Sequence, residues 1–223
     1  MTGDERTKTY IDSLSRDHTG FLLELEEMAA RMDVPIIRRE TQNFLKTILA
    51  AKQPRRALEV GTAIGFSAIL FCTYGPPDFS IVTIENYDKR IPLARENFAR
   101  SGFERKITFL NGDAGELLPG LLGPFDLIFM DAAKGQYLNW LPEIKRLLAP
   151  GGILLSDNVL QDGDLIESRY LVERRKRTIH KRMREYLFAL THDPQLSTCV
   201  LRIGDGIAFT VKEHKGIEER DSE

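Results

Sequence analysis

Short apolar runs alternate with longer amphipathic segments over most of the chain, and this alternation predicts an α/β fold. The strand-length runs cover residues 56–60, 80–85, 107–111, 125–130 and 152–156. Helical segments separate them at residues 67–74, 88–101, near 115–122 and at 137–148. Strand–helix–strand crossovers are right-handed and make the strands parallel. We therefore expect a mostly parallel sheet with helices on both faces.

Both ends of the chain depart from this alternation. Helices are predicted at residues 4–15, within 18–32 and at 40–51, with Met32 on a core face and a break at Val34-Pro35. A long helix over 168–191, with Ile179 on its core face, precedes strands at 196–202 and 207–212. The Gly204-Asp205-Gly206 turn makes these strands a hairpin, so an antiparallel pair closes the sheet. We expect one domain over residues 1–223, with an N-terminal helical cap (1–52) and a core (53–212).

Composition limits the class of protein more than it identifies it. The 223 residues are 42% hydrophobic and 29% charged, with a formal net charge of -2. These values fit one soluble domain and give no global signal for nucleic acid or membrane. Cys72 and Cys199 are interpreted as buried small hydrophobes, because two separated thiols indicate neither a disulfide framework nor a zinc site. The polar N-terminus and the lack of an apolar run of about 20 residues favour a cytoplasmic protein without a membrane partner.

Carboxylates follow two consecutive predicted strands. Asp131 ends the strand at 125–130, and Asp157 and Asn158 end the strand at 152–156. Each acid alone is more typical of a helix cap or a turn than of a metal site. Together they would meet at the carboxyl edge of the sheet, with Lys134 three residues past the first acid. Three oxygen ligands without Cys or His suit a hard cation such as Mg2+.

The turn after the first strand predicts a nucleoside-binding loop. Gly61 and Gly65 allow close approach of a ligand and a sharp turn into a helix, but Ala63 stands where the dinucleotide fingerprint needs a glycine. Glu85 ends the second strand, where an acid accepts both ribose hydroxyls. Asp113 follows the third strand and could accept from an adenine amino group. An adenosine without a diphosphate is implied, which indicates S-adenosylmethionine.

These motifs resemble the metal-dependent S-adenosylmethionine O-methyltransferases of the catechol and caffeoyl-CoA type. The resemblance rests on LEVGTAIGFSA (58–68), VTIE (82–85), NGDAGELL (111–118), FDLIFMDAAKGQY (125–137), LLSDNVL (154–160) and IGDGIAFTVK (203–212). It implies a Rossmann-like, seven-stranded sheet with the last strand antiparallel, and a homodimer. It implies Lys134 and Asp131 as catalytic residues and Asp131, Asp157 and Asn158 as metal ligands. The implied cofactor contacts are Ile37, Gly61, Ala63, Ser67, Glu85, Asp113, Ala114 and Asp131.

The chain resembles more closely a bacterial branch of this family, which methylates 5-hydroxyuridine at the tRNA wobble position. The shared segments are VPIIRRE (34–40), DAAKGQY (131–137), DNVL (157–160) and ERRKRTIHKRMREY (173–186). Arginine suits phosphate through its bidentate fork, although a charged helix face is more often only solvated. The expected RNA contacts, with tRNA as the partner, are Arg38, Arg39, Arg174, Arg175, Arg177, Lys181 and Arg184.

The leading interpretation is Mg2+-dependent methyl transfer from S-adenosylmethionine to the 5-hydroxyl of 5-hydroxyuridine at the tRNA wobble position, although the motifs around the metal cannot separate it from a catechol. Catechol offers two vicinal oxygens, and 5-hydroxyuridine offers its 5-hydroxyl and 4-carbonyl, so one metal site could serve either. Lys134 could remove the acceptor's proton or orient its oxygen. A small-molecule catechol or caffeoyl-CoA-type acceptor is the alternative to tRNA, and a non-catalytic nucleotide-binding module is a third reading. None of the four histidines sits in a ligand-like cluster.

Overall fold

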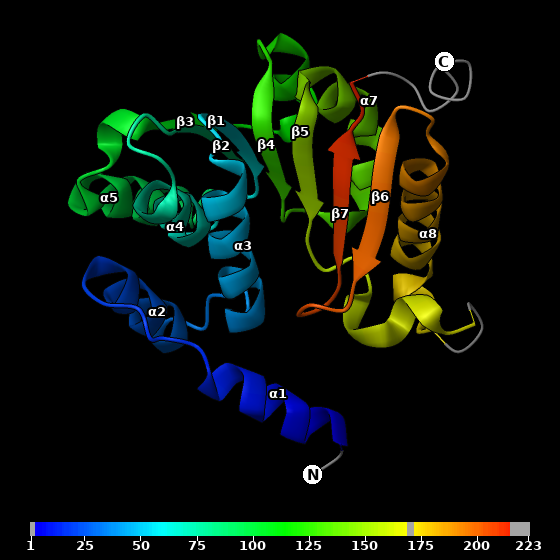
Figure 1. Cartoon of the computed structure of the whole chain (residues 1–223), viewed down its shortest axis with the longest axis horizontal. Coiled ribbons are helices and arrows are strands. Elements are labelled where there is room, and N and C mark those ends of the chain that lie inside the picture. Colours follow the sequence, from blue (N-terminus) through cyan, green and yellow to red (C-terminus); the bar gives the residue numbers. More distant parts are fainter. Residues whose placement is uncertain (1–2, 169–171, 215–223) are drawn as a thin grey trace.

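A computed structural model describes residues 3–168 and 172–214, which form a seven-stranded sheet surrounded by helices (Figure 1). The strand order is β3-β2-β1-β4-β5-β7-β6. Strands β1 to β5 pair in parallel, and β7 is antiparallel to both β5 and β6. The predicted fold class is confirmed. The strands are β1 Arg56–Val60, β2 Ser80–Glu85, β3 Ile107–Asn111, β4 Phe125–Met130, β5 Leu148–Ser156, β6 Leu196–Leu201 and β7 Ile207–Lys212.

Helices cover the two faces of the sheet with separate apolar cores. Alternate residues of a strand point to opposite faces, so Leu127 and Phe129 of β4 join α2 to α5, while Ile128 and Met130 join α7 and α8. Strands buried on both faces are continuously apolar, which explains why β1 and β4 stand out in the sequence. The helices are α1 Gly3–Ser13, α2 Phe21–Arg31, α3 Arg39–Lys52, α4 Phe66–Tyr74, α5 Ile91–Ser101, α6 Ala114–Leu117, α7 Tyr137–Leu147 and α8 Arg177–His192.

Three predicted element bounds were wrong. The helix expected from residue 88 begins at Ile91, after a turn, with Pro92 in its first turn. Strand β5 begins at Leu148, four residues before the expected start, because Pro150 and two glycines lie within its irregular first half. The long helix expected from residue 168 begins at Arg177, after a 3-10 turn at Arg174–Lys176. Residues 169–171 lie outside the described residues.

Three predicted burial assignments were also wrong. Met32 is 48% exposed and Ile179 is 40% exposed, while His180 is buried in place of Ile179. His180 can be buried because its Nε2 makes a hydrogen bond with the Glu167 carbonyl oxygen at 3.2 Å. Cys72 is buried as expected, but Cys199 is exposed because it lies on the edge strand β6.

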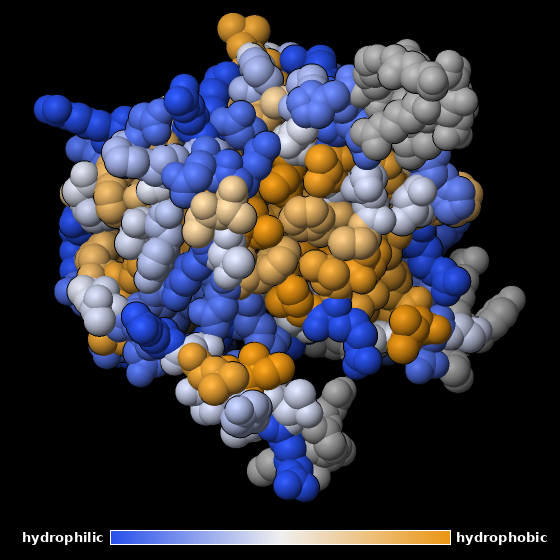
Figure 2. Space-filling view, viewed as in Figure 1, coloured by the Kyte–Doolittle hydropathy of each residue, from blue (hydrophilic) through white to orange (hydrophobic). Residues whose placement is uncertain are grey.

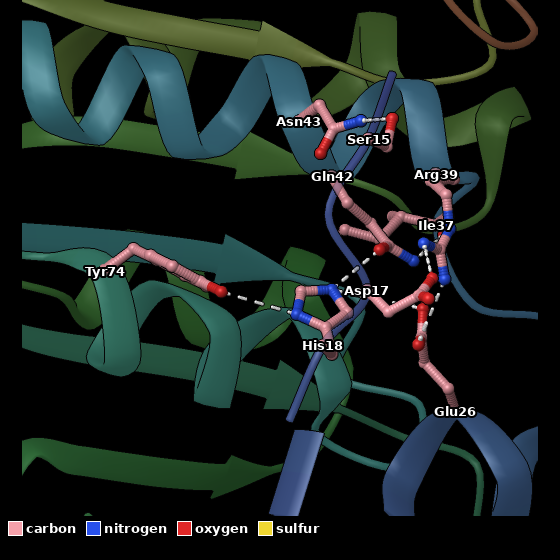
Figure 3. Close-up of polar contacts among 9 residues, drawn as sticks. All are labelled: Ser15, Asp17, His18, Glu26, Ile37, Arg39, Gln42, Asn43 and Tyr74. Atoms are coloured by element: carbon pink, nitrogen blue, oxygen red, sulfur yellow. Dashed lines mark hydrogen bonds and ion pairs between the residues drawn. The ribbon is translucent and has the colours of Figure 1, made fainter. Parts of the chain in front are cut away.

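The N-terminal helices are joined to the core by a polar network that is buried around His18 and Gln42 (Figure 3). His18 Nε2 makes a 2.9 Å hydrogen bond with Gln42 Oε1, and Gln42 Nε2 donates to the Ile37 carbonyl oxygen at 2.9 Å. Arg39 Nη1 pairs with Asp17 at 2.6 Å, and Arg39 Nη2 with Glu26 at 3.5 Å. The network fixes the segment between α2 and α3 that ends at Ile37.

One face of the sheet is not fully covered by helices. Figure 2 shows apolar side chains gathered over β7 and β6, between α3 and α8 of Figure 1. Phe209 and Val211 of β7 are half-buried there, and the Phe209 ring lies 6.1 Å from the Phe44 ring in an edge-to-face contact. No helix within the described ranges is both long and apolar enough to cross a lipid bilayer.

Candidate active site

A cavity of about 490 Å³ lies at the carboxyl ends of the central parallel strands. In open α/β sheets, ligands bind at the carboxyl ends of the strands, at the point where the strand order reverses. The cavity brings together residues from distant parts of the chain: Pro35, Ile36, Ile37, Arg38, Gly61, Ala63, Glu85, Asn86, Arg90, Asp131, Ala132, Ala133, Lys134, Asp157, Asn158 and Asp205.

The loop after β1 approaches β4 more closely than any side chain would allow. A Cβ on Gly61 would lie 2.1 Å from the Asp131 carbonyl oxygen, and Gly61 has a φ of +106°. Ala63 adopts a left-handed φ of 49°, and its N–H donates to Glu85 Oε2 at 2.8 Å. The other carboxylate oxygen of Glu85 accepts from the backbone N–H groups of Asn86 and Tyr87. Glu85 is therefore held at the cavity wall by three backbone donors.

A buried acid lies beneath this loop. Glu59 is fully buried on β1, and Thr83 Oγ1 donates to its Oε2 at 2.5 Å. Because Thr83 gives its proton to Glu59, the 2.6 Å contact between Thr62 and Thr83 has Thr62 as donor. Burial raises the pKa of Glu59 to about 7, although the Ser67 and Thr83 hydroxyls oppose the shift. Ser67 thus acts on Glu59 and does not line the cavity.

Asp131 and Asp157 emerge side by side from neighbouring strands. Their preceding residues, Met130 and Ser156, are paired in the sheet, and the Asp157 N–H donates to the Met130 carbonyl oxygen at 2.9 Å. Lys134 Nζ lies 2.8 Å from Asp131 Oδ1. Burial, and then the charge of Asp131, raise the pKa of Asp157 from 3.8 to about 7. Two carboxylates at one edge disfavour each other's ionisation unless a cation joins them.

Tyr137 fixes the turn that carries Asp131 and Lys134. Its buried hydroxyl donates to the Met130 carbonyl oxygen at 2.8 Å and accepts from the Ala132 N–H at 3.2 Å. Arg182 of α8 donates to the Gly135 carbonyl oxygen at 2.9 Å from the other side. The 3-10 turn at Lys134–Gln136 is therefore held between α7 and α8.

Asn158 has the backbone and side-chain geometry of a positioned ligand. Its φ of 57° is left-handed, which asparagine tolerates, and its N–H donates to Asp157 Oδ1 at 2.8 Å. Its side-chain Nδ2 donates to Asp205 Oδ2 at 3.3 Å. The side-chain oxygen of Asn158 is the atom that this arrangement leaves for a ligand.

The donor set fits a hard divalent cation. No three side chains of His, Cys, Asp and Glu gather into a metal cluster among the described residues. An ion at this edge would therefore take its third protein ligand from the Asn158 amide. Asp157 supplies a buried carboxyl that is costly to ionise alone and that a cation would stabilise as a carboxylate. Carboxylate and amide oxygens are ligands that Mg2+ accepts.

Asp113 and Ala114, two of the expected cofactor residues, do not line this cavity. Asp113 lies in a second cavity of about 300 Å³ with Gly115 and Trp140, and its Oδ1 accepts from the Gly115 N–H at 2.7 Å. Asn86, which lines the first cavity, donates to Asp113 Oδ2 at 3.4 Å, so the two cavities meet at this pair. Ala114 is buried and lines neither cavity.

The expected RNA-contact residues divide into two groups. Arg38 lines the cavity and pairs with Asp205 at 2.7 Å, whereas Arg39 begins α3 and faces Asp17 and Glu26. Of the others, Arg174 and Arg175 lie in the 3-10 turn before α8, and Arg177, Lys181 and Arg184 lie in its first half. Helix α8 begins at the same edge of the sheet as the cavity (Figure 1). Arg174 and Arg184 are exposed, and Arg177 is half-buried. Arg175 pairs with Glu173, and Lys181 pairs with Glu185.

Sequence reasoning missed three polar residues that line the cavity, namely Asn86, Arg90 and Asp205. Asn86 and Arg90 follow Glu85, so their place after β2 was a usable signal. Asp205 lies in the hairpin between β6 and β7, and only the insertion of β7 beside β5 brings it to Asn158.

The family model described as O-methyltransferase matches residues 12–213. A catechol O-methyltransferase of Niastella koreensis is 33% identical over 128 residues, and one of Mycobacterium tuberculosis is 36% identical over 124 residues. These matches cover 56% and 55% of this chain and only 58% and 56% of those relatives' lengths.

Solved structures extend the similarity to nearly the whole chain. A Staphylococcus aureus protein solved as a candidate caffeoyl-CoA O-methyltransferase is 30% identical, with a TM-score of 0.85, over 92% of this chain and 99% of that one. A Podospora anserina methyltransferase bound to S-adenosylhomocysteine is 26% identical, with a TM-score of 0.84, over 94% of this chain and 95% of that one. The chain belongs to the O-methyltransferase family.

Proposed function

We propose that this protein transfers the methyl group of S-adenosylmethionine to one of two vicinal oxygens of an acceptor held by a divalent cation. The observation that carries the proposal is one cavity that contains Asp131, Lys134, Asp157 and Asn158 beside the Gly61 loop and Glu85. The relatives named above are catechol O-methyltransferases and a candidate caffeoyl-CoA O-methyltransferase, and these names support the same chemistry.

The residues of the cavity divide into donor and acceptor sides. Gly61, Ala63 and Ile37 would enclose the sulfonium donor, and Glu85 would accept the ribose hydroxyls. Asp131, Asp157 and Asn158 would hold Mg2+. When bound, the ion would supply Lewis-acid chemistry that lowers the pKa of the acceptor hydroxyl. Holding acceptor and donor in line accounts for roughly 7–11 kcal/mol of barrier in well-oriented systems.

Lys134 is the group placed to handle the proton. Its Nζ lies 2.8 Å from Asp131 Oδ1, at the boundary between the two sides. As a neutral amine, Lys134 would take the proton of the acceptor hydroxyl, the hydroxyl oxygen would form a bond to the methyl carbon, and the carbon–sulfur bond would break. S-adenosylhomocysteine leaves with the electron pair of that bond. Proton transfer by a placed side chain contributes about 10²–10⁴-fold.

A small catechol-type molecule is the acceptor that the relatives' names favour. The 5-hydroxyl of 5-hydroxyuridine in a tRNA anticodon loop is a second acceptor, and the position of the basic residues favours it. Arg174 lies in the 3-10 turn before α8, and Arg177 and Arg184 lie in the first half of α8, which begins at the same edge of the sheet as the cavity. A splayed loop base could enter while these side chains contact phosphates.

One assay separates these acceptors. The enzyme is incubated with Mg2+ and labelled S-adenosylmethionine, either with catechol and caffeic acid or with tRNA that carries 5-hydroxyuridine. Transfer to the catechols alone would eliminate tRNA, and transfer to tRNA alone would eliminate the small acceptors. Asp157→Asn is the negative control, because it removes one carboxylate of the proposed ion site. No transfer to either acceptor by the native enzyme would contradict the proposed chemistry.

A further inference from the structure

The hairpin between β6 and β7 contacts the proposed ion site through Asp205. The Asp205 side chain is 13% exposed, and its Oδ2 accepts from Asn158 Nδ2 at 3.3 Å. An asparagine amide has two ends, and a metal ion binds only its oxygen. A carboxylate placed on the nitrogen end holds that end away from the ion. Asp205 therefore selects the orientation in which the Asn158 oxygen is the available ligand.

The Asp205 backbone position is fixed independently of its side chain. Its carbonyl oxygen accepts from the Leu160 N–H at 2.9 Å, and the Gly206 carbonyl oxygen accepts from the Val159 N–H at 3.0 Å. The two backbone hydrogen bonds hold the hairpin against the residues that follow Asn158. A substitution at the Asp205 side chain leaves them intact, so the fold of the hairpin is expected to survive it.

Arg38 connects this hairpin to the segment that covers the cofactor side of the cavity. Arg38 Nη2 lies 2.7 Å from Asp205 Oδ1, and the Arg38 side chain is 46% exposed. The preceding residue, Ile37, is buried in the cavity wall, and its carbonyl oxygen accepts from Gln42. Glu40 of α3 adds a second link, because its Oε2 accepts from the Gly204 N–H at 3.0 Å. The segment over the cofactor and the turn beside the ion site are thus joined by two contacts.

We propose that Asp205 is a positioning residue for Asn158, and that the Arg38–Asp205 ion pair makes Mg2+ binding and cofactor binding cooperative. The inference rests on the proposed function, because it takes Asn158 as an ion ligand. Removing a residue that orients a metal ligand through a hydrogen bond typically lowers metal affinity about 10–100-fold. Arg38 contacts Asp205 and not Asn158, so removing Arg38 should change the cooperativity between Mg2+ and cofactor binding more than it changes the affinity for Mg2+ alone.

Calorimetry of Mg2+ binding tests the first half without any catalytic turnover. Asp205→Ala is expected to weaken Mg2+ binding about 10–100-fold. Asp205→Asn keeps an oxygen that can accept from Asn158 Nδ2 and is expected to recover part of the loss. Arg31→Gln is the matched control, because Arg31 pairs with Glu27 on the surface of α2 and does not line the cavity. Circular dichroism of each variant checks that the fold is retained.

Titration of S-adenosylhomocysteine with and without saturating Mg2+ tests the second half. In the native protein each ligand should tighten the binding of the other by the same factor, since binding linkage is reciprocal. Arg38→Gln should bring that factor close to one while Arg31→Gln preserves it. A native factor of one, or an unchanged factor in Arg38→Gln, would overturn the cooperative link.

The outcomes distinguish this inference from the proposed function. If the native protein binds Mg2+, Asp157→Asn abolishes that binding and Asp205→Ala leaves it unchanged, the positioning role is refuted and the ion site stands. If the native protein binds no Mg2+, both the positioning role and the proposed ion chemistry are refuted. A loss in Asp205→Ala with partial recovery in Asp205→Asn supports the inference.

Discussion

Ion binding at this site should expel a proton from Asp157, and the extent should depend on pH. Burial and the nearby Asp131 charge raise the pKa of Asp157 from 3.8 to about 7. That shift corresponds to roughly 4 kcal/mol needed to ionise Asp157 without a counter-charge. The carboxyl is then about nine-tenths protonated at pH 6 and about one-tenth protonated at pH 8. Mg2+ binds the carboxylate, so binding must release the proton that the neutral Asp157 carboxyl carries.

Isothermal titration calorimetry in buffers of different ionisation enthalpy measures this release directly. We expect release of about 0.9 proton per Mg2+ at pH 6 and about 0.1 at pH 8, with Mg2+ affinity rising up to about tenfold per pH unit below pH 7. Asp157→Asn should show neither strong binding nor proton release. Equal proton release at pH 6 and pH 8, or none at pH 6, would refute the assignment of Asp157 as a buried ligand that is protonated before the ion binds.

The remaining predictions concern other parts of the same edge. Glu59 has a folded-state pKa raised to about 7, so ionisation of Glu59 destabilises the folded state. This destabilisation is absent below pH 4.5 and complete above pH 7. The free energy of unfolding of Glu59→Gln, relative to that of the native protein, should therefore rise by roughly 2 kcal/mol from pH 5 to pH 8. Urea unfolding that gives the same difference at both pH values would contradict this. Lys134→Met should lower kcat by about 10²–10⁴-fold while calorimetry shows unweakened Mg2+ binding, and a loss of Mg2+ affinity would instead make Lys134 part of the ion site. Gly61→Ala should abolish S-adenosylhomocysteine binding, because its Cβ would lie 2.1 Å from the Asp131 carbonyl oxygen, and native affinity in that variant would contradict the tight approach. Light scattering checks the homodimer expected from the family resemblance, and a monomer mass would exclude it. Phe209→Glu places a charge on the sheet face that helices do not fully cover, and tests whether that face forms the dimer contact.

The parallel strands and their acidic ends could be predicted because the signals are local. A buried strand such as β4 is one unbroken apolar run, and Asp131 follows it directly. The start of β5 could not be predicted, since Pro150 and its glycines have the pattern of a break although the strand passes through them. Burial of His180 was missed because a hydrophobic pattern counts histidine as polar and does not detect its partner, the Glu167 carbonyl oxygen.

The contacts behind the ligands could not be predicted because they are set by topology. Asp205 reaches Asn158 only because β7 lies between β5 and β6, and Arg38 reaches Asp205 across more than 160 residues of sequence. In the sequence, Arg38 belongs to a basic pair with Arg39, and both were interpreted as RNA contacts. The structure separates them, because one joins the cavity wall and the other joins the network around α2.

If Asp131, Asp157 and Asn158 hold the ion as proposed, they would serve any pair of vicinal oxygens, so we expect the residues around the cavity to set the choice of acceptor. The turn that carries Lys134 meets α8 at Gly135, where an added Cβ would lie 3.9 Å from Ile179 and 3.8 Å from Arg182. Ile179, at 40% exposure beside this turn, is the apolar side chain that we expect a flat aromatic acceptor to contact. The arginines just before it offer charge to a phosphate backbone. A phosphate-bound acceptor should lose affinity steeply with salt, whereas a catechol packed on Ile179 should not, so the salt dependence of KM reports which of these residues the true acceptor uses.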